Sequence, residues 1–329
     1  NLGKIHTDLD IFYYYNKKNK NITITGTNGK STTVKIIYEV LKCQKIDARL
    51  VGNIGNPILS EKKITPKTVF VIEASSYQLE YSKIFKSHLA AILNISPDHL
   101  ERHGSIRNYI KAKFKLIKTQ TKKDFTFLNT NNLFIKRYLS GQRILSKIIK
   151  INKTVQSKVL KKIDNSNFLS DGNKENLSFV FEIAKKMRIS KNNLFKVLQK
   201  FNGLDFRQQV IFKSKNLIII NDSKATSFSS TASILRSITN VYWIVGGQAK
   251  KGDKFLLKKS ECKNMEAYIF GKNKKFFINK LKKKINYQLF DDLKSSIKKI
   301  LIDIKKNNKK QKQHIILFSP AAASFDSFK

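Results

Sequence analysis

The stretch from Ile22 to Thr33, which reads ITITGTNGKSTT, constrains the fold of this chain more than any other segment. Its first four residues are β-branched and predict a buried strand, and the loop that follows contains Gly26 and Gly29. A helix is expected from Thr32 to Lys42. A strand, a glycine loop and a helix N-terminus together form a cradle of backbone N–H groups for phosphate. The stretch therefore indicates nucleotide phosphate chemistry, and an ordinary turn before a helix is the alternative.

Two side chains of this loop have the chemistry that a bound nucleotide requires. Lys30 is placed to reach the β- and γ-phosphates, and the Ser31 hydroxyl is placed to bind Mg²⁺. The chain departs from the general phosphate-loop pattern at Ile24, where that pattern has glycine.

Length and composition describe a folded protein with room for two domains. The chain has 329 residues, of which 41% are hydrophobic, and only 4 prolines. No apolar run approaches the roughly 18 residues that span a bilayer, and no signal peptide opens the sequence. Cys43 and Cys262 form neither a disulfide framework nor a metal motif. We expect a cytoplasmic monomer that does not insert into membranes.

The formal net charge of +42 would attract any polyanion without specificity. The lysines are spread among Asn and Ile along the whole chain, as in 280–284 and 305–312, with no interleaved aromatic pattern for stacking bases. We therefore interpret the charge as a solvated surface and expect no specific nucleic-acid partner.

Short apolar runs alternate with helical segments, which predicts an α/β protein with mainly parallel sheets. The pattern resets near residue 205, so we expect a central ATPase domain over 1–205 and a Rossmann-like α/β domain over 206–329. Residues 1–20 are interpreted as a lead-in or linker remnant, and 141–165 give no clear pattern. The predicted helices cover 32–42, 106–118 and 176–187, and the predicted strands cover 22–25, 69–72, 89–93, 125–128, 217–220, 241–245, 267–270 and 315–318.

Ligands of open α/β sheets bind beyond the carboxyl ends of the strands, so the residues that end each strand are candidate ligands. Glu73 follows the strand 69–72 and could hold Mg²⁺, or it could cap a helix. Asp98 and His99 follow the strand 89–93, and one of them could be a second metal ligand, although a lone His is often structural.

Two helical segments carry further candidates. Lys111, Lys113 and Lys115 cannot share one helix face, so at least one of them is expected to point inward. A buried lysine near metals and phosphates would have a lowered pKa, and a neutral amine can react with CO₂ to form a carbamate. Asn173 and Asn176 lie three apart and could cap a helix or contact adenine.

In the second domain, three strand ends are followed by loops rich in hydroxyls and lysines. These loops are 221–227, 246–250 and 319–324. They indicate a site for a second anionic ligand, a carboxylate.

Taken together, these segments resemble the Mur ligase family of ATP-dependent amide ligases, over nearly the whole chain. Within that family they are similar to the member that adds D-glutamate to UDP-N-acetylmuramoyl-L-alanine (UDP-MurNAc-L-alanine) in peptidoglycan synthesis. The segments that carry the resemblance are GTNGKST at 26–32, GNIGNP at 52–57, EASSYQLE at 73–80, NDSKAT at 221–226 and SPAAASFD at 319–326.

The resemblance implies a ligase that uses ATP and two Mg²⁺ ions and forms an acyl phosphate. Lys30, His99 and Lys113 would be catalytic, with Lys113 as a carbamate. The metal ligands would be Ser31, Glu73, His99 and Lys113. ATP would contact Gly26, Thr27, Asn28, Gly29, Lys30, Ser31, Thr32, Asn173, Asn176, Arg207 and Asp222. The substrates would contact Asn53, Lys224, Thr226, Lys250 and Ser324.

The resemblance leaves two alternatives open. The family has an N-terminal domain that binds uridine diphosphate, and only about two dozen residues precede the phosphate loop here, so either that domain is missing or this chain is incomplete. The chain could instead be another amino-acid ligase of the superfamily, such as a folylpolyglutamate-type enzyme, or a truncated nucleotide-binding protein without activity.

Overall fold

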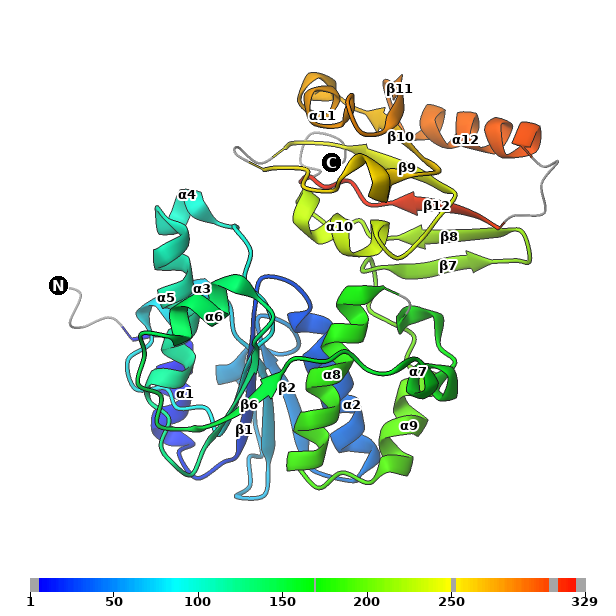
Figure 1. Ribbon diagram of the computed structural model, residues 1–329. Coiled ribbons are helices and arrows are strands. Elements are labelled where there is room, and N and C mark those ends of the chain that lie inside the picture. Colours follow the sequence, from blue (N-terminus) through cyan, green and yellow to red (C-terminus); the bar gives the residue numbers. More distant parts are fainter. Residues whose placement is uncertain (1–5, 169, 250–252, 308–312, 324–329) are drawn as a thin grey trace. The chain divides into compact units, whose positions relative to one another are not determined.

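The computed structural model describes residues 6–168, 170–249, 253–307 and 313–323. The chain divides into two compact units, the first formed by Asn1–Asn165 and Asn173–Phe201 and the second by Ser166–Gly172 and Asn202–Lys329. Each unit is built around a six-stranded sheet (Figure 1), so the predicted α/β class is confirmed. The domain limits 1–205 and 206–329 stay a prediction, which differs from these units in the segments Ser166–Gly172 and 202–205.

The sheet of the first unit is entirely parallel, with the order β2-β3-β1-β4-β5-β6. Its central strands are buried apolar runs, as expected for a sheet that is covered on both faces. The register pairs Ile24 with Glu73 and Thr25 with Ile92, so the ends of β1, β3 and β4 meet at one edge. The strands are β1 (Asn21–Thr25), β2 (Ala48–Gly52), β3 (Val69–Glu73), β4 (Leu89–Ile92), β5 (Phe125–Asn129) and β6 (Lys147–Ile151).

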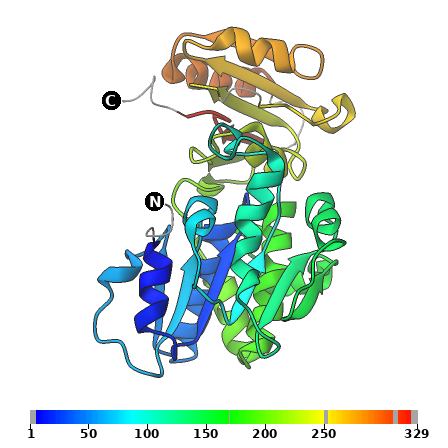
Figure 2. The ribbon, with the colours of Figure 1, turned by 90° about the vertical axis from the view of Figure 1, so that its left-hand side faces the viewer.

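Helices cover both faces of this sheet (Figures 1 and 2). One face carries α2 (Lys30–Cys43), α8 (Asp171–Lys186) and α9 (Lys191–Lys200). The other carries α1 (Asp8–Tyr15), α3 (Ser76–Tyr81), α5 (Ile106–Lys118) and α6 (Leu133–Leu139). Two short helices, α4 (Leu100–His103) and α7 (Ser157–Ile163), complete the unit.

Helix α1 lies within the segment 1–20 that the sequence analysis interprets as a lead-in, and it is part of the core of the first unit. Leu9 and Phe12 are buried in that core. The buried Asp10 carboxylate accepts hydrogen bonds from three successive backbone N–H groups after α3, those of residues 83, 84 and 85. Because these N–H groups have a charged acceptor, α1 is fixed to the rest of the unit.

The second unit has the strand order β11-β10-β9-β12-β8-β7, in which only β7 runs antiparallel. Its strands are β7 (Gln209–Lys213), β8 (Leu217–Asn221), β9 (Val241–Gly246), β10 (Met265–Phe270), β11 (Asn286–Phe290) and β12 (His314–Phe318). Short 3₁₀ segments, such as η4 (Lys259–Cys262), connect some of these elements.

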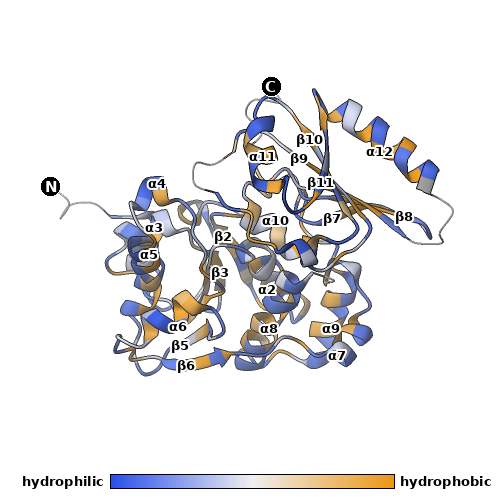
Figure 3. Cartoon of the chain, turned by 45° about the horizontal axis from the view of Figure 1, so that its top comes forward, coloured by the Kyte–Doolittle hydropathy of each residue, from blue (hydrophilic) through white to orange (hydrophobic). Residues whose placement is uncertain are grey.

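Alternating side chains of these strands build two cores in the second unit. Trp243 and Val245 pack with α10 (Phe228–Leu235) and α11 (Lys274–Leu281), whereas Tyr242 and Ile244 pack on the other face with α12 (Leu293–Asn307). Figure 3 shows hydrophobic and hydrophilic residues alternating along α12, as expected for a helix that buries one face. In the part of the chain that the structure describes, no helix is long and apolar enough to cross a bilayer.

Candidate functional site

The predicted phosphate loop joins β1 to α2 and has the backbone that such a loop requires. Gly29 is the N-cap of α2, with φ +84° and no side-chain cap. A Cβ at this position would lie 2.2 Å from Oδ1 of Asn176, a buried residue of α8. Glycine is therefore required here for two reasons, the left-handed backbone and the close approach of Asn176.

Asn94, which follows β4, holds the loop from the neighbouring strand end. Its Oδ1 accepts from the N–H of Asn28 at 2.9 Å, and its backbone carbonyl accepts from the N–H of Thr27 at 2.9 Å. The Thr27 hydroxyl lies 3.0 Å from the hydroxyl of Tyr109 on α5. The loop is thus fixed by residues of β4 and α5 as well as by its own strand and helix.

Two lysines donate to the same carbonyl oxygen of the loop. Lys30 Nζ lies 2.9 Å from the carbonyl oxygens of both Gly26 and Thr27, and Lys113 Nζ lies 2.8 Å from that of Gly26. These contacts bring two lysine amines together beside the N-terminus of α2, where the positive end of the helix dipole also favours an anion.

Lys113 points inward from α5, as the spacing of the three lysines requires for at least one of them. Its side chain is 1% exposed and lies over the Tyr109 ring, whereas Lys111 is exposed. Burial, together with the charge of Lys30, lowers the pKa of Lys113 well below its ordinary value. Asp98 and Glu73 are near enough to oppose this shift.

Glu73 ends β3 and is the best candidate metal ligand of the described residues. Its Oε1 accepts from Asn53 Nδ2 at 2.8 Å, and its buried Oε2 has no hydrogen-bond partner in the described part of the chain. The Ser31 side chain is also buried, in the first turn of α2. A free carboxylate oxygen and a hydroxyl are the hard oxygen ligands that Mg²⁺ takes, so this pair fits the ion.

His99 has other partners in this structure. It has a left-handed backbone at the N-cap of α4, and its Nδ1 lies 3.1 Å from the Tyr77 hydroxyl. It also pairs with Asp98 and Glu101. Among the described residues, no hydrogen bond or ion pair joins His99 to the other predicted metal ligands, and no group of three His, Cys, Asp or Glu side chains could hold a metal.

Asn173 and Asn176 lie on one face of α8, and Asn176 Nδ2 donates to Asn173 Oδ1 at 3.2 Å. The helix begins at Asp171 rather than at the predicted Asn176, so neither residue is its N-cap. Asn176 instead packs against Gly29 of the phosphate loop.

In the second unit, the loops after β8 and β12 meet at the Asp222 carboxylate. Asp222 is buried and accepts from the Ser319 hydroxyl at 2.8 Å and from the Gln208 N–H at 3.1 Å. Burial raises its pKa to about 7, against the opposing effects of both hydrogen bonds and the Arg207 charge. Lys224 Nζ lies over the Phe206 ring, and Arg207 is exposed.

The loops after β9 and β12 are also joined, because Gln248 and Ala323 exchange two backbone hydrogen bonds of 2.7 and 3.1 Å. Thr226 is partly buried in the loop after β8. The predicted ligands Lys250 and Ser324 lie outside the described residues. Strand-end loops of the second unit therefore converge at Asp222 and at Gln248.

Comparison with known proteins is consistent with this geometry. The sequence profile described as the Mur ligase middle domain matches residues 24–193, which include the phosphate loop, Glu73, His99 and Lys113. The chain belongs to the Mur ligase family. The family resemblance stated from the sequence is thus confirmed.

Relatives of this Mur ligase match almost its whole length. The UDP-N-acetylmuramoylalanine--D-glutamate ligase of Rickettsia bellii is 31% identical over 345 residues, covering 99% of this chain and 76% of the relative. The protein of the same name from Francisella tularensis subsp. novicida is 36% identical over 332 residues, with the same coverage.

Solved Mur ligases have the same fold. MurF from Acinetobacter baumannii aligns with a TM-score of 0.67 at 15% identity, covering 95% of this chain and 76% of that one. MurF from Thermotoga maritima, crystallised with ADP, aligns with a TM-score of 0.66 at 13% identity, covering 97% and 82%. These similarities support the architecture of both units.

Sequence reasoning missed two residues that hold the loop of this Mur ligase. Asn94 could have been found, because it directly follows a buried strand beside the phosphate loop, where the strand-end rule directs attention. Tyr109 gave no such signal, since an aromatic residue on the inner face of a helix is ordinarily a core residue.

Proposed function

We propose that this Mur ligase joins D-glutamate to UDP-MurNAc-L-alanine at the expense of ATP, a step in the synthesis of peptidoglycan precursors. The observation that carries the proposal is the match to relatives named for that reaction, which covers 99% of this chain at 31–36% identity. The phosphate loop with its two converging lysines supplies the chemistry that ATP requires.

The proposed reaction has two steps. A carboxylate oxygen of the L-alanine residue attacks the γ-phosphorus of ATP, ADP leaves, and an acyl phosphate forms. The amine nitrogen of D-glutamate then attacks the acyl carbon, loses a proton, and displaces phosphate to leave an amide. The loop N–H groups that follow Asn28, at the N-terminus of α2, and the Lys30 ammonium would stabilise the charge on the phosphoryl group during transfer.

Ser31 and Glu73 would hold a first Mg²⁺, which neutralises phosphate charge when bound. The free Oε2 of Glu73 supports this assignment. His99 and a carbamate on Lys113 would hold a second ion. For that role His99 would have to exchange its pairing with Asp98 and Glu101 for the metal.

The carbamate rests on the environment of Lys113. A buried lysine with a lowered pKa has a larger neutral fraction, and its nitrogen lone pair can attack CO₂ and release a proton. The product is an anionic oxygen ligand beside Lys30 and the phosphate loop. Its negative charge would be balanced there by Lys30 and by Mg²⁺.

The remaining site residues are assigned by the same proposal. Asn173 and Asn176 would contact adenine, and Arg207 and Asp222 would contribute to ATP binding. Asn53 would contact the nucleotide sugar, although its amide also donates to Glu73. Lys224, Thr226, Lys250 and Ser324 would bind substrate carboxylates.

The test is ATP-dependent amide formation by the whole chain. With UDP-MurNAc-L-alanine and ATP, phosphate release should require D-glutamate, and mass spectrometry should find the new amide. L-Glutamate, D-alanine and diaminopimelate should release no phosphate above background. Release with another of these amino acids would favour a different ligase. ATP binding without any amide would favour the nucleotide-binding alternative.

A further inference from the structure

A wide cavity of the second unit lies at the opposite end of its sheet from the loops at Asp222. Its volume is about 1060 Å³, slightly larger than the range of roughly 300–1,000 Å³ that is usual for small-molecule sites. The first residues of four parallel strands line it: Val241 of β9, Met265 of β10, Asn286 of β11 and His314 of β12. This cavity is therefore separate from the ligand loops assigned above.

The lining is cationic. Lys259, Lys263, Lys284 and Lys306 line the cavity, with Glu266 as the only carboxylate among the lining residues. Oε1 of Glu266 accepts from Gln288 Nε2 at 2.8 Å, and its Oε2 lies 3.3 Å from the Tyr268 hydroxyl. The carboxylate is thus held by the sheet. Lys284 Nζ donates to the carbonyl oxygen of Phe255 at 2.9 Å, whereas Lys259, Lys263 and Lys306 keep their charge available for a ligand. No described ion pair involves Lys259, Lys263 or Lys306.

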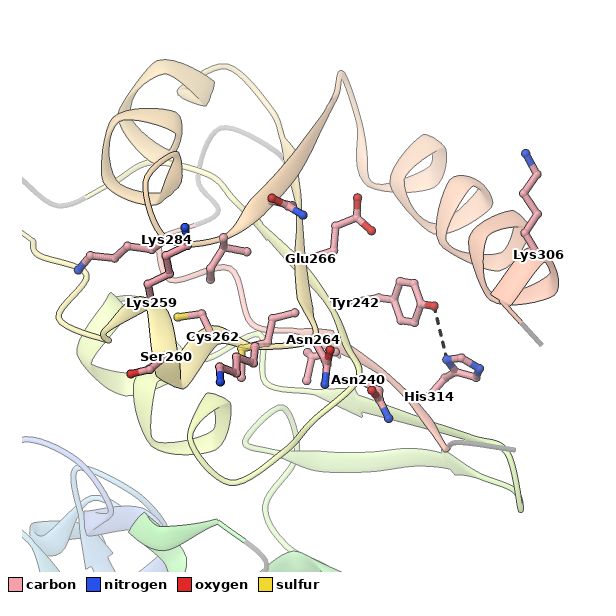
Figure 4. Close-up of a pocket in the computed structure, with 15 residues that line it drawn as sticks. Asn240, Tyr242, Lys259, Ser260, Cys262, Asn264, Glu266, Lys284, Lys306 and His314 are labelled. Atoms are coloured by element: carbon pink, nitrogen blue, oxygen red, sulfur yellow. Dashed lines mark hydrogen bonds between the residues drawn. The ribbon is translucent and has the colours of Figure 1, made fainter. Parts of the chain in front are cut away.

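Neutral donors add to this charge. The Asn240 and Asn264 side chains lie in the loops that precede β9 and β10 (Figure 4). The buried His314 has its Nδ1 3.4 Å from the Tyr242 hydroxyl, and its Nε2 has no partner among the described residues. In the tautomer in which Nδ1 accepts from Tyr242, Nε2 carries a proton and is a hydrogen-bond donor.

We propose that this cavity is a second anion site, which binds a chain of two or more phosphate groups. Several lysines spread over a wide cavity favour a multivalent anion, because ammonium groups attract phosphate without a fixed geometry. No arginine lines the cavity, so the bidentate geometry that selects a carboxylate is missing from the lining. Figure 4 shows Lys259 and Lys284 on one side and Tyr242 with His314 on the other.

The chain offers a direct reporter for this site. It contains two methionines, Met265 in the cavity and Met187 directly after α8 in the first unit. In the whole chain labelled with methyl-¹³C methionine, inorganic tripolyphosphate should shift the Met265 signal to saturation. Met187 should shift little, and adenosine without phosphates should leave Met265 unmoved. Tripolyphosphate bound at the phosphate loop would not reproduce this pattern.

Matched variants separate a built site from the general charge of the chain. Lys259→Gln/Lys263→Gln should weaken tripolyphosphate binding at Met265 by about tenfold. Lys275→Gln/Lys298→Gln, which changes two exposed lysines of the same unit outside the cavity, should weaken it less than about twofold. All four positions are exposed, so both variants should fold, which circular dichroism will check.

Two results would overturn the proposal. One is a Met265 signal that tripolyphosphate does not move. The other is equal weakening by both double variants, which would attribute binding to the diffuse positive field. Neither result bears on the ligase reaction, because the cavity contains none of the residues assigned to it.

Discussion

Lys113 Nζ donates to the carbonyl oxygen of Gly26, 2.8 Å away, and Lys30 donates to the same oxygen. A lysine of α5 is thereby tied to the loop that is proposed to hold phosphate. Because Lys113 is buried and its pKa is lowered, its chemistry can be separated experimentally from that of the exposed lysines around it.

Lys113→Ala should abolish amide formation, because it removes both the contact to the loop and the amine that would form the carbamate. We expect a loss of at least about a hundredfold in kcat. Lys111→Ala, two residues away on the exposed face of the same helix, should keep near-normal activity. In ¹³C-bicarbonate, a carbamate signal should appear in the wild type and the Lys111 variant only. An active wild type without that signal would contradict the carbamate proposal.

Gly29→Ala should impair both folding and ATP binding. The new Cβ would meet Asn176 at 2.2 Å on a backbone with φ +84°. Gly104→Ala is the matched control, because its φ is +70° but nothing lies within 4 Å of its Cβ. The control should cost about 1 kcal/mol of the free energy of unfolding, from the backbone alone. Gly29→Ala should cost at least about 2 kcal/mol more, measured by urea denaturation. Equal losses would show that Asn176 moves aside freely.

Glu73→Gln should raise the Mg²⁺ concentration needed for half-maximal activity by about tenfold, because it removes the charge and keeps the size of the side chain. The amide can still accept from Asn53, so the fold should be kept. Glu39→Gln on the surface of α2 is the control for the loss of one negative charge. Binding of Mn²⁺ in the presence of ATP, followed by electron paramagnetic resonance, should show the same difference without turnover. An unchanged metal requirement would contradict a ligand role for Glu73.

Asp222 should make the second unit less stable as the pH rises from about 4 to 7. Its pKa is about 7 in the folded state and 3.8 ordinarily, so in this window the folded chain binds a proton that the unfolded chain has lost. Asp222→Asn should remove this loss of stability. For a pKa shift of this size, the free energy of unfolding of the wild type should fall by up to about 4 kcal/mol over that pH range. Thermal unfolding of both proteins at several pH values measures the difference. If the stability of both proteins changed with pH in the same way, Asp222 would be ionised in the folded state over this range.

Burial explains which strands the sequence could predict. The eight strands expected from apolar runs are the interior strands of the two sheets. The four that were missed, β2, β6, β7 and β11, are the edge strands. Edge strands have one open side and are partly exposed, so their sequences carry lysines and other polar residues instead of a continuous apolar run.

In the candidate site, residues at strand ends could be predicted from the sequence, whereas contacts between distant segments could not. The phosphate loop and Glu73 lie directly at strand ends, so sequence order alone places them. Helical periodicity predicts that at least one of Lys111, Lys113 and Lys115 points inward, and the structure shows that Lys113 does. The contacts of Asn176 with Gly29 and of Tyr109 with Thr27 join segments far apart in the chain, and local pattern contains no information about them.

The way in which α1 is held has a practical consequence for protein engineering. Splicing a foreign uridine-binding module onto this chain must leave Thr7 to Tyr15 intact, because Thr7 caps the helix and Phe12 packs edge-on against Phe70 of β3. A junction placed just before the phosphate loop would delete α1, so Phe70 would lose its aromatic partner and three backbone N–H groups would lose the Asp10 carboxylate. Chimeras should therefore be joined upstream of Thr7.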